Sequence, residues 1–187
     1  MSILTAMQQM SQAELPEALE TLHLRYGRYA LNEFLRETEV YRTSSTLLLD
    51  GRETYTPALP YETQPLHIKA VYLDDRRLSL TGDPARVRLD GRTLRVNPEL
   101  KGTLTVELSL NVSPLDGDVD LEILDAWLEP LVAGTLARLY AMKQYHWADL
   151  NAAVYHRSVF DAGVQAARVE AKGLKAGRPM VVAYGGI

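Results

Sequence analysis

Cysteine is absent from this sequence of 187 residues, and phenylalanine and tryptophan occur only twice each. Without cysteine the chain can form no disulfide, no thiolate metal site and no cysteine nucleophile. No apolar run approaches the roughly 18 residues that a membrane-spanning helix requires. The first residues lack the basic and apolar segments of a signal peptide, so we expect neither a signal peptide nor a membrane partner. The formal net charge of −4 argues against a uniformly basic nucleic-acid-binding chain, although local basic patches remain possible.

The side chains that usually carry catalysis are few and poorly spaced. The histidines show no zinc-binding spacing, and the sequence has no phosphate-binding loop or nucleophile elbow. Acids alternate through residues 116–122. They suit the start of a helix, where the helix dipole favours acids, better than a calcium loop, whose glycine and closing glutamate are misplaced. We therefore expect no enzyme activity, no cofactor and no metal. The histidines are His23, His67, His146 and His156.

The rest of the composition, with 47% hydrophobic and 24% charged residues, is that of a globular protein with a real core. Apolar residues recur every three to four positions over residues 16–37 and predict a helix. A capping box at residues 11–14 precedes it, and the helix is expected to begin at Pro16. Residues 1–10 are weakly patterned and predict either a short helix or a frayed end.

Two longer helices are predicted in the last third of the chain. An apolar stripe over residues 121–142 marks the first, which Pro130 should kink or split near Glu129. The second begins after Asp149, a suitable N-cap, and Gly173 is a suitable stop.

Small residues predict how these two helices meet. Gly134 lies inside the first helix at a cost of about 1 kcal/mol relative to alanine, which suggests that another helix passes close by. The facing stripe of the second helix contains Phe160 and Gly163 among several alanines. We therefore expect the two helices to pack tightly as an antiparallel pair.

The spacing changes from helical to strand-like over residues 41–118. Short segments rich in β-branched and aliphatic residues alternate with turn residues, which predicts an antiparallel β region of about five to seven strands. Residues 103–110 alternate between apolar and polar, so one face should be packed and the other wet. Two Asp-Gly pairs each suit a tight hairpin, because glycine accepts a positive φ. These pairs are Asp50-Gly51 and Asp90-Gly91.

The predicted fold class is therefore α+β. Residues 1–40 and 119–173 form a helical bundle with one N-terminal and two long C-terminal helices, and residues 41–118 form an inserted antiparallel β region. Residues 174–187 form an extended C-terminal tail, basic and apolar, that nothing assigns to the core.

Three stretches resemble the head-to-tail adaptor, or connector, proteins of tailed bacteriophages. The first is the helix that ends in Phe-x-x-x-Thr-x-Val-Tyr-Arg at residues 34–42. The second is the strand, turn and strand of residues 48–55, followed by Pro57. The third and most specific combines a glycine-containing helix, a tryptophan at a helix turn and a Phe-x-x-Gly helix that runs into a basic tail. Its segments are residues 134–140, 147–149, 153–163 and 166–168.

The resemblance implies a structural virion protein of the neck, between capsid portal and tail, made in the host cytoplasm. Such proteins form a homo-oligomeric ring of about twelve copies, matched to the symmetry of the portal. The inserted β region would face the tail or nozzle proteins. DNA would pass through the lumen during ejection without sequence-specific binding.

The resemblance also assigns residues to two kinds of contact. In such adaptors the C-terminal segment inserts between portal subunits, where Val181, Val182 and Tyr184 would be anchors. Lys175 and Arg178 would meet acids on the portal. The portal-binding tail also includes Pro179 and Met180. Helix packing, or contact between subunits, would use Gly134, Leu136, Arg138, Trp147, Phe160 and Gly163.

Two other interpretations stay open at this point. A neck, stopper or tail-completion ring would sit further from the portal and bind only after another adaptor is present. A non-viral α+β module would instead bind a small ligand or another protein.

Overall fold

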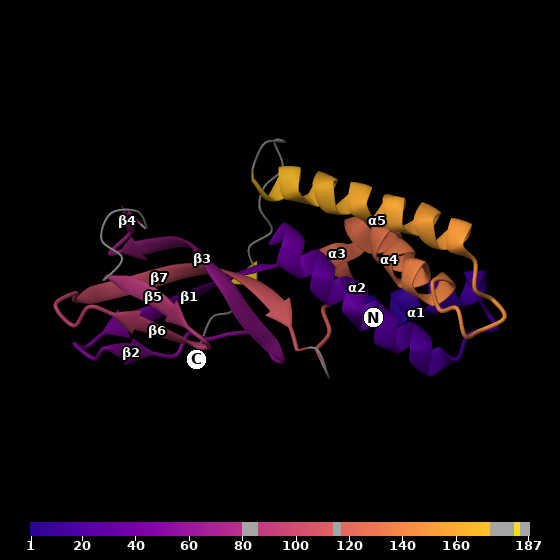
Figure 1. Cartoon of the computed structure of the whole chain (residues 1–187). Coiled ribbons are helices and arrows are strands. Elements are labelled where there is room, and N and C mark those ends of the chain that lie inside the picture. The colour runs from indigo at the N-terminus through magenta and orange to yellow at the C-terminus, as the bar shows by residue number, and fades with distance from the viewer. Residues whose placement is uncertain (80–85, 114–116, 173–181, 184–187) are drawn as a thin grey trace. The chain divides into compact units, whose positions relative to one another are not determined.

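The computed structural model describes residues 1–79, 86–113, 117–172 and 182–183 (Figure 1). The chain divides into two compact units. Unit 1 combines Met1–Val40 with Val112–Pro179 and contains the helices. Unit 2 combines Tyr41–Asn111 with Met180–Ile187 and contains two sheets. The α+β fold class predicted from the sequence is confirmed.

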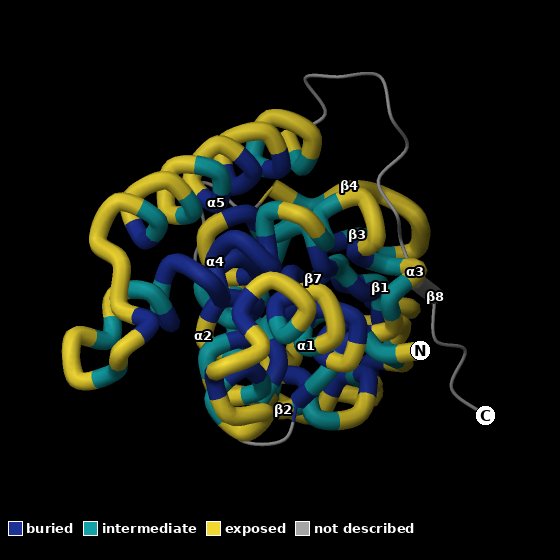
Figure 2. The backbone as a smooth tube through the Cα atoms, turned by 90° about the vertical axis from the view of Figure 1, so that its right-hand side faces the viewer, coloured by how far each residue is buried: buried dark blue, intermediate teal, exposed yellow. Residues whose placement is uncertain are grey.

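Unit 1 is a helical bundle built around α4 (Leu128–Tyr140). Every residue from 131 to 139 is buried except Arg138. The backbone of α4 is accordingly largely dark blue in Figure 2. The helix is covered because α1, α2 and α5 all pack against it. The remaining helices of the unit are α1 (Ile3–Glu14), α2 (Glu20–Thr38), α3 (Leu121–Leu124), the 3-10 helix η1 (Asp125–Trp127) and α5 (Leu150–Ala171).

The N-terminal segment forms two helices, one over the weakly patterned first residues and a second that begins at Glu20 and not at Pro16 as expected. The expectation of a capping box at residues 11–14 is wrong, because Ser11 lies inside α1 and its hydroxyl is 2.9 Å from Nδ1 of His23. The N-cap of α1 is Ser2, whose side chain accepts a hydrogen bond from the backbone N–H of Thr5. Burial of apolar residues such as Ile3 fixes this helix against the bundle.

The helix predicted over residues 121–142 is split, as Pro130 suggested. The chain forms α3 and η1 before α4 begins at Leu128, so Pro130 stands in the first turn of α4. A proline is tolerated there, because the first N–H groups of a helix have no intrahelical partner. The following helix, α5, begins where the sequence predicted. Its N-cap Asp149 accepts hydrogen bonds from the backbone N–H groups of Asn151 and Ala152.

Unit 2 contains a five-stranded and a three-stranded sheet. The five-stranded sheet has the order β4-β3-β7-β1-β8, in which β1 and β7 pair antiparallel over the whole of β1. The three-stranded sheet has the order β2-β6-β5. Among the described residues between Arg42 and Val112 there are seven strands, within the predicted range. The bounds are β1 (Arg42–Leu49), β2 (Thr54–Tyr55), β3 (Thr63–Leu73), β4 (Arg76–Leu78), β5 (Val87–Asp90), β6 (Thr93–Val96), β7 (Gly102–Val112) and β8 (Val182–Ala183).

One of the two predicted Asp-Gly hairpins forms. Asp90 pairs with Thr93 across a two-residue turn in which Gly91 has φ 59°. The prediction for Asp50-Gly51 is wrong, because β1 pairs with β7 and β2 pairs with β6. Asp50 instead belongs to a turn that the hydroxyl of Tyr55 closes, at 2.9 Å from Oδ1 of Asp50. A strand's partner is therefore not always its neighbour in sequence, even where glycine allows a tight turn.

Candidate functional site

The predicted contact between the last two long helices is present, and two glycines make it possible. A Cβ atom added to Gly134 of α4 would lie 2.5 Å from Cδ2 of Phe160 on α5 and 3.1 Å from Cβ of Ala30 on α2. A Cβ atom added to Gly163 of α5 would overlap the ring of Pro130 on α4. Each helix thus has a glycine where a ring of the other helix sits, and the two backbones approach closely.

The apolar residues of the predicted contact set lie inside unit 1. The side chain of Phe160 is fully buried, with its ring centroid 6.3 Å from that of Phe34 on α2. Leu136 on α4 is 1% exposed. These residues stabilise the helical bundle of unit 1, because buried aromatic and aliphatic side chains dominate core energetics.

Arg138 is the charged member of that set and lies where α2, α4 and α5 meet. Its guanidinium forms an ion pair with Glu33 of α2 and donates a hydrogen bond to the carbonyl oxygen of Gly134. Arg157 of α5 lies 2.9 Å from the other carboxylate oxygen of Glu33 and 2.9 Å from Asp161. One glutamate therefore joins three helices.

The environments of the two arginines differ. Burial lowers the pKa of Arg138, and the neighbouring carboxylate of Glu33 acts in the opposite direction. The hydrogen bond to Asp161 raises the pKa of Arg157. Both guanidinium groups stay protonated at ordinary pH, because arginine is not deprotonated in proteins. They also flank Phe160, with distances of 5.6 and 5.3 Å from the guanidinium carbons of Arg138 and Arg157 to the ring centroid.

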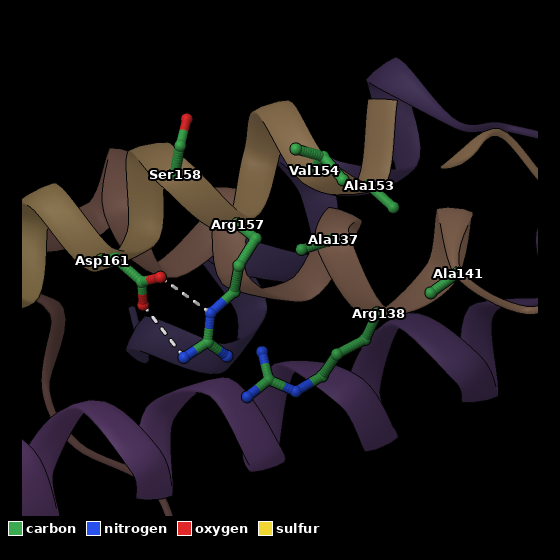
Figure 3. Close-up of a pocket in the computed structure, with 8 residues that line it drawn as sticks. All are labelled: Ala137, Arg138, Ala141, Ala153, Val154, Arg157, Ser158 and Asp161. Atoms are coloured by element: carbon green, nitrogen blue, oxygen red, sulfur yellow. Dashed lines mark hydrogen bonds and ion pairs between the residues drawn. The ribbon is translucent and has the colours of Figure 1, made fainter. Parts of the chain in front are cut away.

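A groove of about 520 Å³ opens beside this network, between α4 and α5. Figure 3 shows the guanidinium groups of Arg138 and Arg157 near each other at one side of the groove. Alanines supply much of its wall, and Val154 is 63% exposed. The groove therefore offers apolar surface next to charges that are already paired. Its lining residues are Ala137, Arg138, Ala141, Ala153, Val154, Arg157, Ser158 and Asp161.

Trp147 lies in the connection between α4 and α5 and is 9% exposed. Its ring stacks on that of Tyr145, with 4.2 Å between centroids. His156 of α5 makes two contacts near the same end of the bundle. Its ring stacks on that of Tyr140, and its Nε2 lies 2.9 Å from a carboxylate oxygen of Glu14 on α1. Aromatic stacking and this contact fasten the end of the bundle.

Of the predicted portal-binding tail, the structure describes only Val182 and Ala183. Their backbone forms β8, which pairs in parallel with Thr43 and Ser44 of β1. The other predicted tail residues lie outside the described residues. These are Lys175, Arg178, Pro179, Met180, Val181 and Tyr184.

Sequence reasoning missed three members of the charged network, Glu33, Arg157 and Asp161. The spacing of Arg157 and Asp161, four residues apart on one helix, is a local signal for their ion pair. Glu33 gives no such signal, because its partners Arg138 and Arg157 are 105 and 124 residues away in the sequence.

Comparison with known protein families gives no match to this chain, and no curated protein matches it. In the part of the chain that the structure describes, no group of three histidine, aspartate or glutamate side chains could hold a metal ion. Among the same residues, no helix has both the length and the apolar character needed to cross a membrane.

Proposed function

We propose that this protein is a head-to-tail adaptor of a tailed bacteriophage, a virion protein that forms a ring between the portal and the tail. The observation that carries the proposal is the order of parts along the chain. A helical unit is interrupted after Val40 by a β unit, resumes at Val112, and is followed by a basic, apolar tail. This is the order that the three sequence stretches suggested.

The contact residues of the third stretch give further support. Gly134 and Phe160, from the adaptor-like motifs, meet each other in the packing of α4 against α5. The motif residues therefore have a common physical task, which is to bring two helices into close contact. A rigid body of this kind suits a subunit that must keep its shape in a ring of about twelve copies.

In the proposed assembly, the tail of each subunit binds the portal while the β unit faces the tail or nozzle proteins. Each tail binds through few residues, but a ring presents many tails at once, and linked sites greatly increase the total affinity. DNA passes through the lumen. The subunit is made in the host cytoplasm and ends in the neck of the virion.

Co-expression with the portal protein encoded in the same genome tests the proposal. We expect the protein to co-purify with the portal ring and to form a ring on it. A variant without residues 174–187 should keep its helical circular dichroism but lose docking. A matched control replaces those residues with a glycine-serine linker of equal length, which should also fail to dock.

The other outcomes are informative. Normal docking of the truncated protein would refute the role of the tail. A protein that binds only when another adaptor is already on the portal is a neck or stopper protein. A protein that ignores every portal preparation but gains thermal stability from a small molecule is a ligand-binding module.

A further inference from the structure

The negative charges of α2 are all engaged by neighbouring helices of unit 1. Glu33 and Glu37 form ion pairs with arginines of α4 and α5. Glu20 accepts a hydrogen bond of 2.8 Å from the side chain of Gln8 on α1. The sequence of α2 contains no other acid, so none of its carboxylates is left to neutralise the cations of the same helix.

The arginines of α2 lie on its solvent side. Arg25 and Arg36 are exposed, and Arg28 is half-buried. Among the described residues, none of the three forms an ion pair with a carboxylate, and Arg25 donates a hydrogen bond of 3.3 Å to the hydroxyl of Tyr29. Their spacing of three and eight residues places them on one stripe, about 16 Å long at 1.5 Å per residue. We name these three arginines the basic face of α2.

Folding alone does not explain the basic face. Arg25 and Arg28 are three residues apart, so they are neighbours on the helix surface, where two like charges repel each other. Arg28 is also partly withdrawn from water, since its Nε–H is buried and has no acceptor among the described residues. Burial of a cation without a counter-charge is unfavourable. A carboxylate from another molecule would relieve the repulsion and supply the missing counter-charge.

Two tyrosines border the basic face and add apolar surface to it. Tyr29 is 43% exposed, and the ring of the half-buried Tyr26 meets its ring edge-on, with 5.8 Å between centroids. The guanidinium carbon of Arg25 lies 5.8 Å from the centroid of the Tyr29 ring. Arginine and tyrosine are enriched at protein interfaces, whereas lysine, which α2 lacks, is depleted there. The composition of this surface is therefore typical of a protein-binding site.

We propose that the basic face of α2 binds an acidic α-helix of a partner protein. A guanidinium group donates two parallel hydrogen bonds to one carboxylate, a geometry that lysine cannot form. A helix that lies along α2 presents glutamates or aspartates every three to four residues, which matches the spacing of the arginines. Tyr29 supplies apolar contact beside these ion pairs. The surface is separate from the C-terminal tail, and the inference does not rest on the proposed function.

Two observations favour a protein over a nucleic acid as the partner. The rings of Tyr26 and Tyr29 stand at 80° to each other, and Arg25 lies over one of them, so they form no parallel platform for stacked bases. The chain as a whole has a net charge of −4, which weakens the long-range attraction on which non-specific binding of nucleic acid depends. Ion pairs with an acidic helix act at short range and need no such attraction.

Fluorescence anisotropy with the full chain and a labelled peptide tests this inference. The probe is an alanine-rich helix of about 20 residues whose glutamates form one stripe, and its matched control has the same composition with the glutamates scattered around the helix. We expect the striped peptide to bind about tenfold more tightly. The double variant Arg28→Gln and Arg36→Gln should lose about tenfold in affinity for it and keep its circular dichroism, because glutamine is a good helix former. The reversal Arg28→Glu with Arg36→Glu should instead prefer a striped peptide with lysines in place of the glutamates.

The control variant is Arg76→Gln with Arg77→Gln, which removes the same charge from β4 in unit 2. It should bind the striped peptide within about twofold of the original protein, because screening limits effects at a distance. An equal loss in this control would overturn the inference, as would equal binding of both peptides, no binding at low salt, or unchanged binding by the α2 glutamine variant. Tighter binding of a DNA duplex or a single-stranded oligonucleotide than of the striped peptide would refute it in favour of a nucleic acid. None of these measurements involves the portal, so they are independent of the docking test.

Discussion

Replacing Gly163 with alanine places a methyl group where the ring of Pro130 already lies. The atoms that would overlap it are Cβ and Cγ of Pro130. They cannot rotate away, because the proline ring is closed onto its own backbone. The helices α4 and α5 must therefore separate locally. Overpacking of this kind costs about 1–3 kcal/mol, and the rigid neighbour places this site near the upper end. Alanine recovers about 1 kcal/mol of helix propensity. The expected net loss is about 2 kcal/mol.

The same substitution at Gly27 in α2 should raise the stability of the protein. A Cβ atom there would meet Leu4 and Met7 at 3.7 Å and Thr135 at 3.8 Å, which is ordinary van der Waals contact. The helix propensity gain of about 1 kcal/mol is then retained. Two identical chemical changes in one bundle should thus differ by about 3 kcal/mol.

Urea unfolding followed by far-UV circular dichroism measures this difference, with the slope of free energy against urea checked for constancy. At about 2–4 °C per kcal/mol for a chain of this size, the melting temperatures of the two variants should differ by about 6–12 °C. If Gly163→Ala were as stable as the original protein, or if Gly27→Ala were less stable, the account of close helix packing would be refuted.

Two further predictions concern polar groups in unit 1. Burial lowers the pKa of His23, so the folded state favours the neutral imidazole. The folded protein should therefore lose stability as the pH falls below about 6.5, the pKa of a histidine in the unfolded chain, towards the lower pKa of the folded state. Urea titrations at pH 7.5 and 5.5, each about one unit from that reference, should show this loss in the original protein and a smaller one in His23→Gln, which does not titrate; equal losses would contradict the prediction. Glu33→Gln should destabilise by about 1.5–3 kcal/mol, because it weakens charged hydrogen bonds to Arg138 and Arg157. Asp161→Asn, which weakens an exposed pair, should cost about 0.5 kcal/mol or less in the same denaturation assay, and an equal cost would show that Glu33 has no special position.

Local patterns predicted the parts of this fold that depend on neighbours in sequence. Gly134 predicted a close helix contact, because a glycine inside a helix lowers helix stability unless close packing requires it. Asp90-Gly91 predicted a hairpin, because this pair suits the tight turn between two neighbouring strands. The N-cap Asp149 was equally local.

The parts that sequence reasoning missed depend on distant partners. The helix α1 is too short to show a clear helical repeat of apolar residues. Ser11 resembles an N-cap in the sequence, but in the structure its hydroxyl contacts the ring of His23. Likewise, the pairing of β1 with β7 joins strands more than fifty residues apart, beyond the reach of any turn signal. Register and helix partners of this kind are decided by burial across the whole unit.

The short strand β8 pairs with the outer edge of β1, so this part of the tail also covers an edge of the sheet. A tail strand that joins another protein leaves the backbone N–H and C=O groups of Thr43 and Ser44 without their partner strand. An uncovered strand edge recruits other strands. Removing the tail should therefore make the protein more prone to aggregate. The aggregation of the truncated chain would measure how much protection the two residues of β8 give to the edge of β1.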